Sequence, residues 1–311
     1  MSALIAGSFA FDNILVFHDK FKNHILPDKV HILNVAFLVP TMRREFGGTA
    51  GNIAFNLKLL GADPIAMGAV GTDFAPYAEW MDKHGISRKY VKEIPEHFTA
   101  QAFITTDEDD NQITAFHPGA MGEAHRQKIA DCTEKVEWGI VSPDGKDAMI
   151  QHSQQFKEAG IPFIFDPGQG LPMFNGDELL DFVDKATYMA VNDYESRMVQ
   201  DRTGLSMDDL AKRLDALIVT RGGEGSDIYT KGEVIHVDAV PPEDVLDPTG
   251  CGDAYRAGIL YGLLNDLDWK TTGQIASLMG SLKVARSGTQ NHHFTLEQFK
   301  GWYKKAFGSS F

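Results

Sequence analysis

Two hydrophobic patterns alternate along most of the chain. Short apolar runs bounded by turn residues predict buried strands, at residues 3–7, 65–70, 138–141, 162–165, 188–191 and 216–220. Apolar residues at helical spacing predict helices, at residues 53–60, 74–84, 148–159, 178–184, 208–214, 252–264, 272–286 and 295–307. Strands that alternate with helices predict a mainly parallel sheet with helices on both faces. The predicted fold class is therefore α/β.

Two regions depart from this alternation. Within residues 14–46, apolar side chains alternate with polar ones around 14–16 and again at 35–39, which predicts short strands. Residues 97–117 contain two apolar segments on either side of an acidic turn, which predicts a hairpin. We expect these two regions to form a small β-lid on a single domain that spans residues 1–311.

The composition narrows the classes of partner. The 311 residues carry 29 Lys and Arg against 43 Asp and Glu, a net charge of −14, without a conspicuous basic run. Nucleic-acid binding needs a basic surface, so this class is excluded. Cys132 and Cys251 form neither a CxxC pair nor a disulfide framework, which favours a reducing cytoplasm. The N-terminal residues lack the basic segment of a signal peptide, and no stretch reaches the ~20 apolar residues of a membrane span.

One stretch carries the clearest candidate chemistry. Residues 247–253 read Asp-Pro-Thr-Gly-Cys-Gly-Asp and lead directly into the helix predicted at 252–264. The glycines let backbone N–H groups at the helix start point outward, where the helix dipole adds positive potential, so that an anion can bind without Lys or Arg. Asp253 is unexpected at an anion site. It either caps the helix or acts as a base beside a phosphate.

Polar or glycine-rich turns also follow several predicted strands. They lie at Asp12, Asp166, residues 192–195 and residues 220–225. The carboxyl ends of parallel strands meet at one edge of an open α/β sheet, which is where nucleotides bind. The chain contains neither a GxxxxGK motif followed by Ser or Thr nor a GxGxxG that opens a βαβ unit, so phosphates must be held by another device. The helix start at 250–252 is the candidate.

Four of these motifs, in this order along the chain, resemble one family. Residues 247–253 are similar to the signature of the ribokinase-like (phosphofructokinase-B type) sugar and nucleoside kinases. Residues 47–52 (GGTAGN) resemble the N-terminal motif of that family, residues 192–195 (NDYE) its NxxE element, and residues 220–225 (TRGGEG) its TxGxxG nucleotide loop. The resemblance implies a ribokinase-like three-layer αβα sandwich with a β-lid, and ATP-dependent phosphorylation of a hydroxyl group.

Within this family, residues 116–121 (FHPGAM) and 253–258 (DAYRAG) are most similar to bacterial adenosine kinases. That likeness implies transfer of the γ-phosphoryl group of ATP to the 5′-hydroxyl of a nucleoside, adenosine in the first place. Asp253 looks like the catalytic base, and the amides of Gly250, Cys251 and Gly252 look like the anion hole that stabilises the transferred phosphoryl group.

The resemblance also assigns the binding residues. The substrate-binding residues would be Ser8, Asp12, Gly48, Asn52, Phe116 and Gln169. The residues on the ATP side would be Asn192, Thr220, Gly222 and Gly225. Glu195 would order Mg²⁺ and its waters, and the loop at Asp247 is where a monovalent cation such as K⁺ is to be looked for. The family resemblance further implies a homodimer formed through the lid.

Other interpretations stay open at this stage. Ala36 and Ala102 stand where bacterial adenosine kinases are expected to carry Ser and an aromatic residue, so another purine nucleoside, ribose or a ketohexose derivative is an alternative substrate. Helix capping is a reasonable alternative role for Asn192, and turn formation for Gly222, while Asp12 suits a loop cap as well as it suits a hydroxyl acceptor. A non-catalytic sensor of nucleosides is disfavoured because Asp253 and the glycines are present, and a Rossmann dehydrogenase because its fingerprint is missing.

Cys251 gives one further expectation. Its place at a helix N-terminus predicts a lowered thiol pKa and therefore sensitivity to oxidation.

Overall fold

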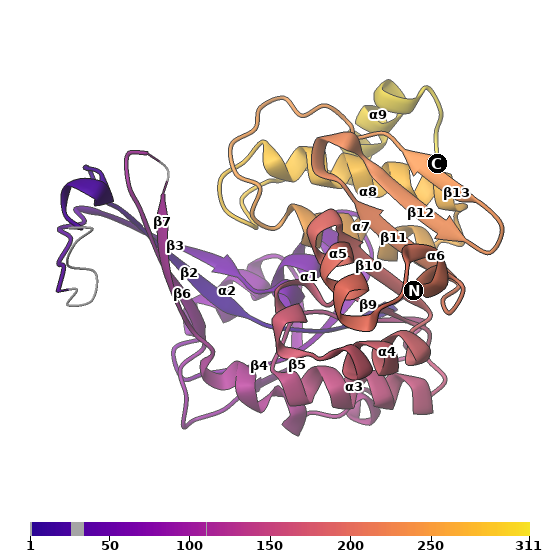
Figure 1. Cartoon of the computed structure of the whole chain (residues 1–311), viewed down its shortest axis with the longest axis horizontal. Coiled ribbons are helices and arrows are strands. Elements are labelled where there is room, and N and C mark those ends of the chain that lie inside the picture. Colours follow the sequence, from indigo (N-terminus) through magenta and orange to yellow (C-terminus); the bar gives the residue numbers. More distant parts are fainter. Residues whose placement is uncertain (1, 26–33, 110) are drawn as a thin grey trace.

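The computed structural model describes residues 2–25, 34–109 and 111–311, and it consists of a large α/β body from which a small sheet projects (Figure 1). The body is built on a sheet of nine strands in the order β13-β12-β11-β10-β9-β8-β1-β4-β5. Their bounds are β1 Ser2–Ala6, β4 Asp63–Val70, β5 Ser87–Glu93, β8 Trp138–Val141, β9 Phe163–Phe165, β10 Tyr188–Asn192, β11 Ala216–Thr220, β12 Ser226–Thr230 and β13 Val234–Val237.

The strands from β5 to β11 pair in parallel, and only β12 and β13 are added antiparallel. The predicted mainly parallel sheet is therefore confirmed. The carboxyl ends of the parallel strands meet at one edge, as the doubly wound arrangement requires.

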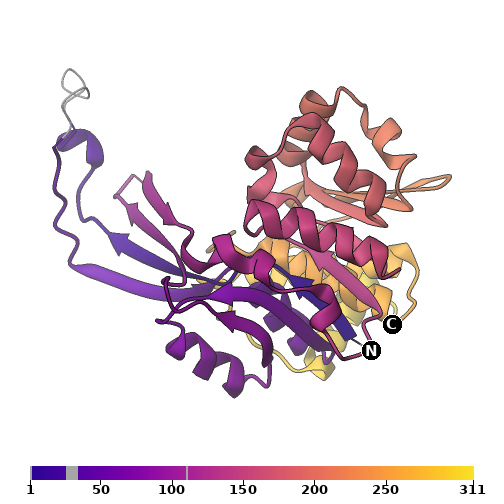
Figure 2. The ribbon, with the colours of Figure 1, turned by 90° about the horizontal axis from the view of Figure 1, so that it is seen from below.

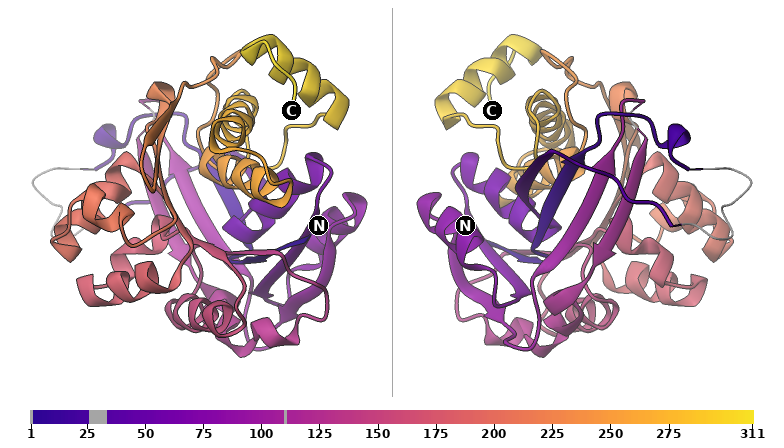
Figure 3. Two further views of the ribbon diagram at one scale, coloured as in Figure 1. Left: turned by 90° about the vertical axis from the view of Figure 1, so that its right-hand side faces the viewer. Right: turned by 90° about the vertical axis from the view of Figure 1, so that its left-hand side faces the viewer.

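Helices cover both faces of this sheet (Figure 3). Their bounds are α1 Thr49–Leu59, α2 Ala75–Lys83, α3 Lys146–Glu158, α4 Gly176–Lys185, α5 Asp193–Thr203, α6 Met207–Ala211, α7 Cys251–Leu264, α8 Trp269–Val284 and α9 Leu296–Phe307. Strand alternation divides the core in two. Ala3 and Ile5 of β1 pack in one cluster with α1, α2 and α7, whereas Leu4 and Ala6 pack in another with α3, α4, α5 and α6. A strand buried on both faces reads as a continuous apolar run, which is why its position was predictable.

The small sheet is the predicted lid. Its strands are β2 Ala10–Val16, β3 Thr41–Gly47, β6 Ala100–Thr106 and β7 Gln112–His117, in the order β3-β2-β6-β7. β2 pairs antiparallel with β3 and in parallel with β6, which pairs antiparallel with β7, so the two predicted lid regions join through β2 and β6 into one sheet. Figure 2 shows the sheet extending away from the helices of the body. Residues 26–33 and 110 of the predicted lid lie outside the described residues.

Several boundaries were predicted wrongly. β2 begins at Ala10, within a stretch that was expected to be the loop after β1. Residues 35–39 are not a strand, although their side chains alternate; Phe37 instead packs against Phe17 and Phe21, with ring centroids 4.8 and 5.0 Å apart. Their alternation therefore reflects local aromatic packing and not a pleated strand.

Two elements, β5 and α5, were not predicted because few of their residues are apolar. β5 has the sequence SRKYVKE and forms the edge of the large sheet, where charged residues are common. α5 carries only two buried residues, Ser196 and Val199, and it begins with a capping box between Asn192 and Glu195 instead of an apolar stripe. Among the described residues, no helix combines the length and apolarity that a membrane crossing demands.

A glycine sets the distance between α7 and α8. A Cβ atom added at Gly258 would lie 2.5 Å from Cα of Ala276, so the two helices meet there through backbone atoms. The helix α7 carries the candidate chemistry at its N-terminus, and this contact therefore helps to hold the site in place.

We expect Gly258→Ala to lower the free energy of unfolding by about 1–3 kcal/mol, because an extra methyl group overpacks this contact. The matched control is Gly301→Ala on α9, where no heavy atom lies within 4 Å of the added Cβ. This control should change stability little or raise it by up to ~1 kcal/mol through helix propensity. Urea unfolding of both variants is the measurement, and equal effects would contradict this account of the packing.

Candidate active site at the start of α7

The N-terminus of α7 is exposed at the carboxyl edge of the sheet. Gly250 caps the helix with φ of +78°, a left-handed conformation that favours glycine, and Gly252 in the first turn is exposed. The first turn of a helix leaves its N–H groups without intrahelical acceptors. The amide of Cys251 donates to the main-chain oxygen of Pro248 at 3.1 Å, so it is occupied within the loop. The amide of Gly252, the next residue, also lies in the first turn and has no acceptor within the helix.

Asp253 is the titratable group at this helix start. Its Oδ2 accepts a hydrogen bond of 2.7 Å from Nδ2 of Asn52 on α1. Burial raises the pKa of Asp253 to about 7, and the hydrogen bond from Asn52 opposes this rise. A carboxyl group with a pKa near neutrality can accept a proton and release it again at physiological pH. The structure thus brings two predicted site residues into direct contact.

The lid places Asp12 and Phe116 on one face. Glu45, Asp12, Ala102 and Phe116 are directly paired across β3, β2, β6 and β7, and residues in such a row point to the same side of a sheet. Burial, together with the charges of Asp247 and Glu45, raises the pKa of Asp12 to about 6. Glu45 in this row accepts a hydrogen bond of 2.8 Å from Nδ2 of Asn291, and the nearby Gly288 donates to Asp247 just before α7, so this face of the lid is the one turned toward the start of α7.

A buried ion cluster lies behind Asp253. Nη2 of Arg256, one turn further along α7, lies 3.1 Å from Oδ1 of Asp166 and 3.9 Å from Oε2 of Glu195. Burial raises the pKa of Asp166 and of Glu195, while Arg256 lowers both. This cluster ties the ends of β9 and β10 to α7.

The predicted nucleotide residues share the next part of the edge. Asn192 and Thr220 are directly paired at the ends of β10 and β11. Gly222 and Gly225 have φ of +53° and +89°, and a Cβ at Gly225 would lie 2.2 Å from the main-chain oxygen of Val237. Gly225 is therefore required by the turn itself. The four residues Asn192, Thr220, Gly222 and Gly225 therefore lie at or just after the ends of β10 and β11. Their role in binding ATP stays a prediction.

Three predicted substrate residues have different surroundings. Ser8 bonds with Thr49 through side-chain and backbone atoms, which joins the end of β1 to the start of α1. Gly48 has φ of +83°, and a Cβ there would lie 2.6 Å from the main-chain oxygen of Ser8, so the chain passes closely over the connection between β1 and β2. Gln169 is exposed in a 3₁₀ helix, Gly168–Met173, after β9. The close packing explains Ser8 and Gly48 structurally, whatever they bind.

The expectation for the Cys251 thiol was wrong. Burial raises the pKa of this thiol to about 11, with Lys283 acting in the opposite direction. Desolvation of the thiolate is the largest influence on this group, the charges of Asp247 and Asp253 act in the same direction, and the thiol stays protonated at neutral pH.

The residues around Asp247 hold an internal cation. Lys283 on α8 is fully buried, and its Nζ donates to the main-chain oxygens of Asp247 at 2.7 Å and of Arg286 at 3.0 Å. The carboxylate of Asp247 accepts the N–H groups of Thr249 at 2.9 Å and Gly288 at 2.8 Å. An additional K⁺ at the Asp247 carbonyl does not fit these residues, because the lysine ammonium takes that oxygen.

The donor set for Mg²⁺ is small. Over residues 2–25, 34–109 and 111–311, no group of three or more His, Cys, Asp and Glu side chains is placed to hold a metal ion. Mg²⁺ that arrives with ATP needs only one or two protein carboxylates, because phosphates and waters supply the other ligands. The carboxylate of Glu195 fits this smaller requirement, whereas that of Asp166 is paired with Arg256.

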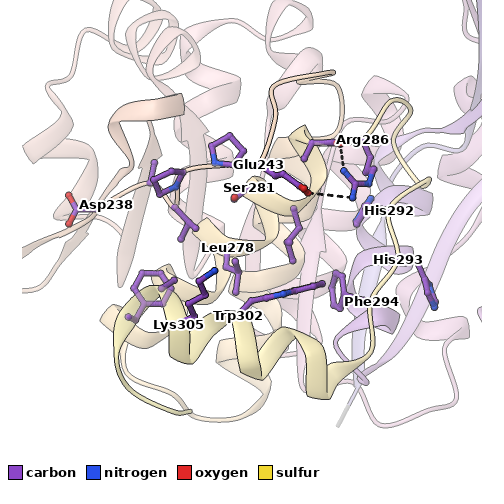
Figure 4. Close-up of a pocket in the computed structure, with 18 residues that line it drawn as sticks. Asp238, Glu243, Leu278, Ser281, Arg286, His292, His293, Phe294, Trp302 and Lys305 are labelled. Atoms are coloured by element: carbon purple, nitrogen blue, oxygen red, sulfur yellow. Dashed lines mark hydrogen bonds and ion pairs between the residues drawn. The ribbon is translucent and has the colours of Figure 1, made fainter.

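Sequence reasoning missed three residues near the site. Gln290 bonds to Asn52, Lys283 fills the Asp247 loop, and Asp144 after β8 is buried with a pKa raised to about 8 by burial. None of them belongs to a recognisable motif, and only the packing shows that these polar side chains are buried. A separate cavity of about 760 Å³ lies between residues 238–243, α8 and α9, and none of the predicted site residues lines it (Figure 4).

Comparison with known proteins gives consistent relatives. A model of the pfkB family carbohydrate kinases matches residues 15–295. The chain is 32% identical over 264 residues to a nucleoside kinase of Methanocaldococcus jannaschii. The aligned region covers 83% of this chain and 85% of that protein. The structure of Burkholderia thailandensis nucleoside kinase in complex with inosine is 48% identical, has a TM-score of 0.91 and covers 99% of both chains.

Two further structures extend this result. The complex of the Burkholderia thailandensis enzyme with ADP-inosine is 51% identical, with a TM-score of 0.88 and coverage of 99% of this chain and 97% of that one. Ribokinase from Thermotoga maritima, at 18% identity and a TM-score of 0.81, shares the fold over 98% of this chain and 99% of its own. The predicted ribokinase-like fold is thereby confirmed, and the chain belongs to the pfkB family of carbohydrate kinases.

Proposed function

We propose that the protein transfers the γ-phosphoryl group of ATP to the 5′-hydroxyl of a purine nucleoside. The observation that carries this proposal is the position of Asp253: a carboxyl group with a pKa near 7 in the first turn of a helix whose N-terminus attracts anions. Relatives named nucleoside kinase, and a neighbour in complex with inosine, support a nucleoside as the acceptor.

In the proposed reaction, Asp253 acts as the general base. The 5′-oxygen of the nucleoside attacks the γ-phosphorus of ATP, and the bond from that phosphorus to the β,γ-bridging oxygen breaks. The hydroxyl proton passes to a carboxylate oxygen of Asp253, and ADP leaves with the electron pair of the broken bond. Asp253 then releases its proton to solvent, which its pKa near 7 allows.

The start of α7 would stabilise the transferred group. Backbone amides of Gly250, Cys251 and Gly252 are the proposed anion hole. Because the amide of Cys251 donates to Pro248, Gly250 and Gly252 are the members of this set that can meet a phosphoryl oxygen without a rearrangement of the loop. The dipole of a 14-residue helix favours negative charge at the same point.

The four paired residues Glu45, Asp12, Ala102 and Phe116, which we call the lid row, favour a nucleoside over a free sugar as the acceptor. Asp12 and Asn52 supply acceptors and donors for ribose hydroxyls near Asp253. Phe116, 54% exposed, lies two strands away from Asp12 on the same face, and the small Ala102 lies between them. A small residue beside an exposed aromatic ring suits a flat base, which a bare ribose lacks. Gly48, Ser8 and Gln169 complete the proposed substrate side.

On the other side of Asp253, Asn192, Thr220, Gly222 and Gly225 would hold ATP at the ends of β10 and β11. Glu195 would orient the waters of the Mg²⁺ that accompanies ATP. When bound, Mg²⁺ supplies charge neutralisation for the phosphates. The buried pair of Arg256 and Asp166 would keep Glu195 in place.

Adenosine is the acceptor that we propose first, with inosine next to it because of the complexes formed by the Burkholderia thailandensis enzyme. The ammonium of Lys283 would do structurally what a monovalent cation does at such a loop, so no requirement for K⁺ is proposed. A cytoplasmic location agrees with the need for ATP.

For Asp253→Asn, we expect kcat with ATP and adenosine or inosine to fall by ~10²–10⁴, because the amide cannot accept the proton. Nucleoside binding should be retained, since the substituted side chain keeps its shape and an acceptor for Asn52. The control is Asp63→Asn, an exposed aspartate at the start of β4, which should keep its activity.

The pH profile supplies a second readout for the same pair. In the parent protein kcat/KM should fall as the pH drops below about 7, where Asp253 becomes protonated. Near-parental turnover by Asp253→Asn would remove Asp253 from the mechanism.

We further propose a homodimer formed through the outer face of the lid. Met42, Phe103 and Ile113 point away from the row of Asp12, by strand alternation, and are 57%, 43% and 44% exposed. Apolar side chains gathered on one face of a projecting sheet are typical of a protein contact.

A second copy would cover this face. Phe103→Glu should convert a dimer into a monomer in sedimentation velocity, because the contact would have to bury a carboxylate. Val234→Glu, at an exposed apolar site on β13, is the matched control and should leave the dimer intact. A monomeric parent protein at micromolar concentration would contradict the proposal.

A further inference from the structure

A chain of hydrogen bonds runs from α2 to Asp253. Nε1 of Trp80 donates to Oε1 of Gln290 at 2.8 Å, and Nε2 of Gln290 donates to Oδ1 of Asn52 at 2.9 Å. Nδ2 of Asn52 then donates to Oδ2 of Asp253 at 2.7 Å. The four residues come from α2, the loop before α9, α1 and α7, which lie far apart in the sequence.

The orientation of the Gln290 amide is determined by its neighbours. An indole N–H is a donor only, so the atom of Gln290 that faces Trp80 must be the oxygen. Nε2 of Gln290 also lies 2.6 Å from the hydroxyl oxygen of Tyr77. That hydroxyl donates its proton to the main-chain oxygen of Gly47 at 2.8 Å, so its oxygen accepts from Gln290. Both contacts require the same orientation of the amide.

This orientation is passed on to Asn52. One hydrogen of the Gln290 amide goes to Tyr77, and the other is directed at Asn52, which must present its oxygen. The NH₂ group of Asn52 is then left to face Asp253. A side-chain amide that turned over would present an oxygen to the carboxylate and replace an attraction by a repulsion.

The surroundings leave little freedom for this chain. Gln290, Asn52 and Tyr77 are buried. The ring of Trp80 is stacked on Phe46 and Phe55, with centroids 5.3 and 6.2 Å apart. A Cβ at Gly51 would lie 1.9 Å from the hydroxyl of Tyr77, so the backbone of α1 packs directly against this side chain of the network. Buried polar networks that are satisfied in this way hold their members in one arrangement.

We propose that Gln290 and Trp80 are positioning residues for the reaction: they fix the amide of Asn52 so that it donates to the carboxylate of Asp253. The proposal rests on the proposed role of Asp253 as the base. A base that is hydrogen-bonded by a fixed donor stays ionised to lower pH than one that is merely buried. The network therefore makes the carboxylate available at neutral pH, although burial alone favours the protonated form.

Other titratable groups also lie around Asp253 and remain unchanged in the test below. They are Asp12 on β2, Tyr77 on α2, Asp166 after β9, Arg256 and Cys251 on α7, and Lys283 on α8.

The test replaces Gln290 by a side chain of similar length without polar atoms. In Gln290→Met, the amide of Asn52 is free to turn, and the acidic limb of the kcat/KM profile should move upward by roughly one pH unit, as expected for the loss of a hydrogen bond to a charged group. At a pH one unit below the parental limb, turnover should fall about tenfold, and at high pH it should approach the parental value. A variant that is merely less stable would not recover its activity with rising pH.

A double-mutant cycle shows whether Gln290 acts through Asn52. In an Asn52→Ala background, Gln290→Met should cause no further displacement of the acidic limb, since the residue that it orients is gone. An equal displacement in both backgrounds would overturn the proposal. The matched control is Gln274→Met on α8, whose side chain accepts a hydrogen bond of 2.6 Å from the hydroxyl of Tyr303 and should leave the limb in place.

Trp80→Phe provides a second variant if Gln290→Met fails to fold. It keeps an aromatic ring at this position and loses the indole N–H together with part of the ring volume, and the limb should move in the same direction by a smaller amount because Gln290 still reaches Asn52. Failure of the two proposals is distinguishable. A parent protein without phosphoryl transfer contradicts the proposed function, whereas an active parent whose limb stays fixed in Gln290→Met and Trp80→Phe contradicts this inference alone.

Discussion

A carboxylate that takes up a proton away from bulk water must be kept ionised by its neighbours. At Asp253, burial raises the pKa to about 7, while the hydrogen bond from Asn52 and the charge of Arg256 act against that rise. The balance is attained only because α1, α7 and the loop before α9 meet at one point. The close contact of α7 with α8 at Gly258 and the buried pair of Arg256 and Asp166 hold the helix that carries Asp253. The site is thus supported from several elements of the body.

The lid contributes a second constraint, which is the register of its strands. Because Asp12, Ala102 and Phe116 are directly paired, one face of the sheet presents a carboxylate, a small residue and an aromatic ring in a row. A shift of one residue in any strand would turn that residue to the opposite face. The opposite face carries the exposed Met42, Phe103 and Ile113, so the two faces of one small sheet differ in chemistry and, in our proposals, in role.

Much of this arrangement was predictable from the sequence. The features that were not predictable depend on packing, which a sequence pattern does not show. Buried parallel strands such as β1 and β11 are continuous apolar runs in the sequence. The glycines at 250 and 252 likewise indicate a helix start with accessible backbone N–H groups. The turn at Asp12 and the helix start at Asp253 suggested both as site residues, but no pattern pointed to Gln290, because its role depends on which groups surround it in three dimensions. The helix dipole at Cys251 was predicted to lower the thiol pKa, and the degree of burial, which the sequence does not state, reverses that effect.

The most direct test of the account is the rate of ADP release from Mg²⁺·ATP with a panel of acceptors: adenosine, inosine, guanosine, cytidine, ribose and fructose 6-phosphate. The account predicts that purine nucleosides are turned over fastest and that the product carries its phosphate on the 5′-oxygen. A preference for ribose or fructose 6-phosphate would contradict the nucleoside assignment and reduce the lid row to packing. Turnover of no acceptor in the panel would contradict the proposed kinase activity itself.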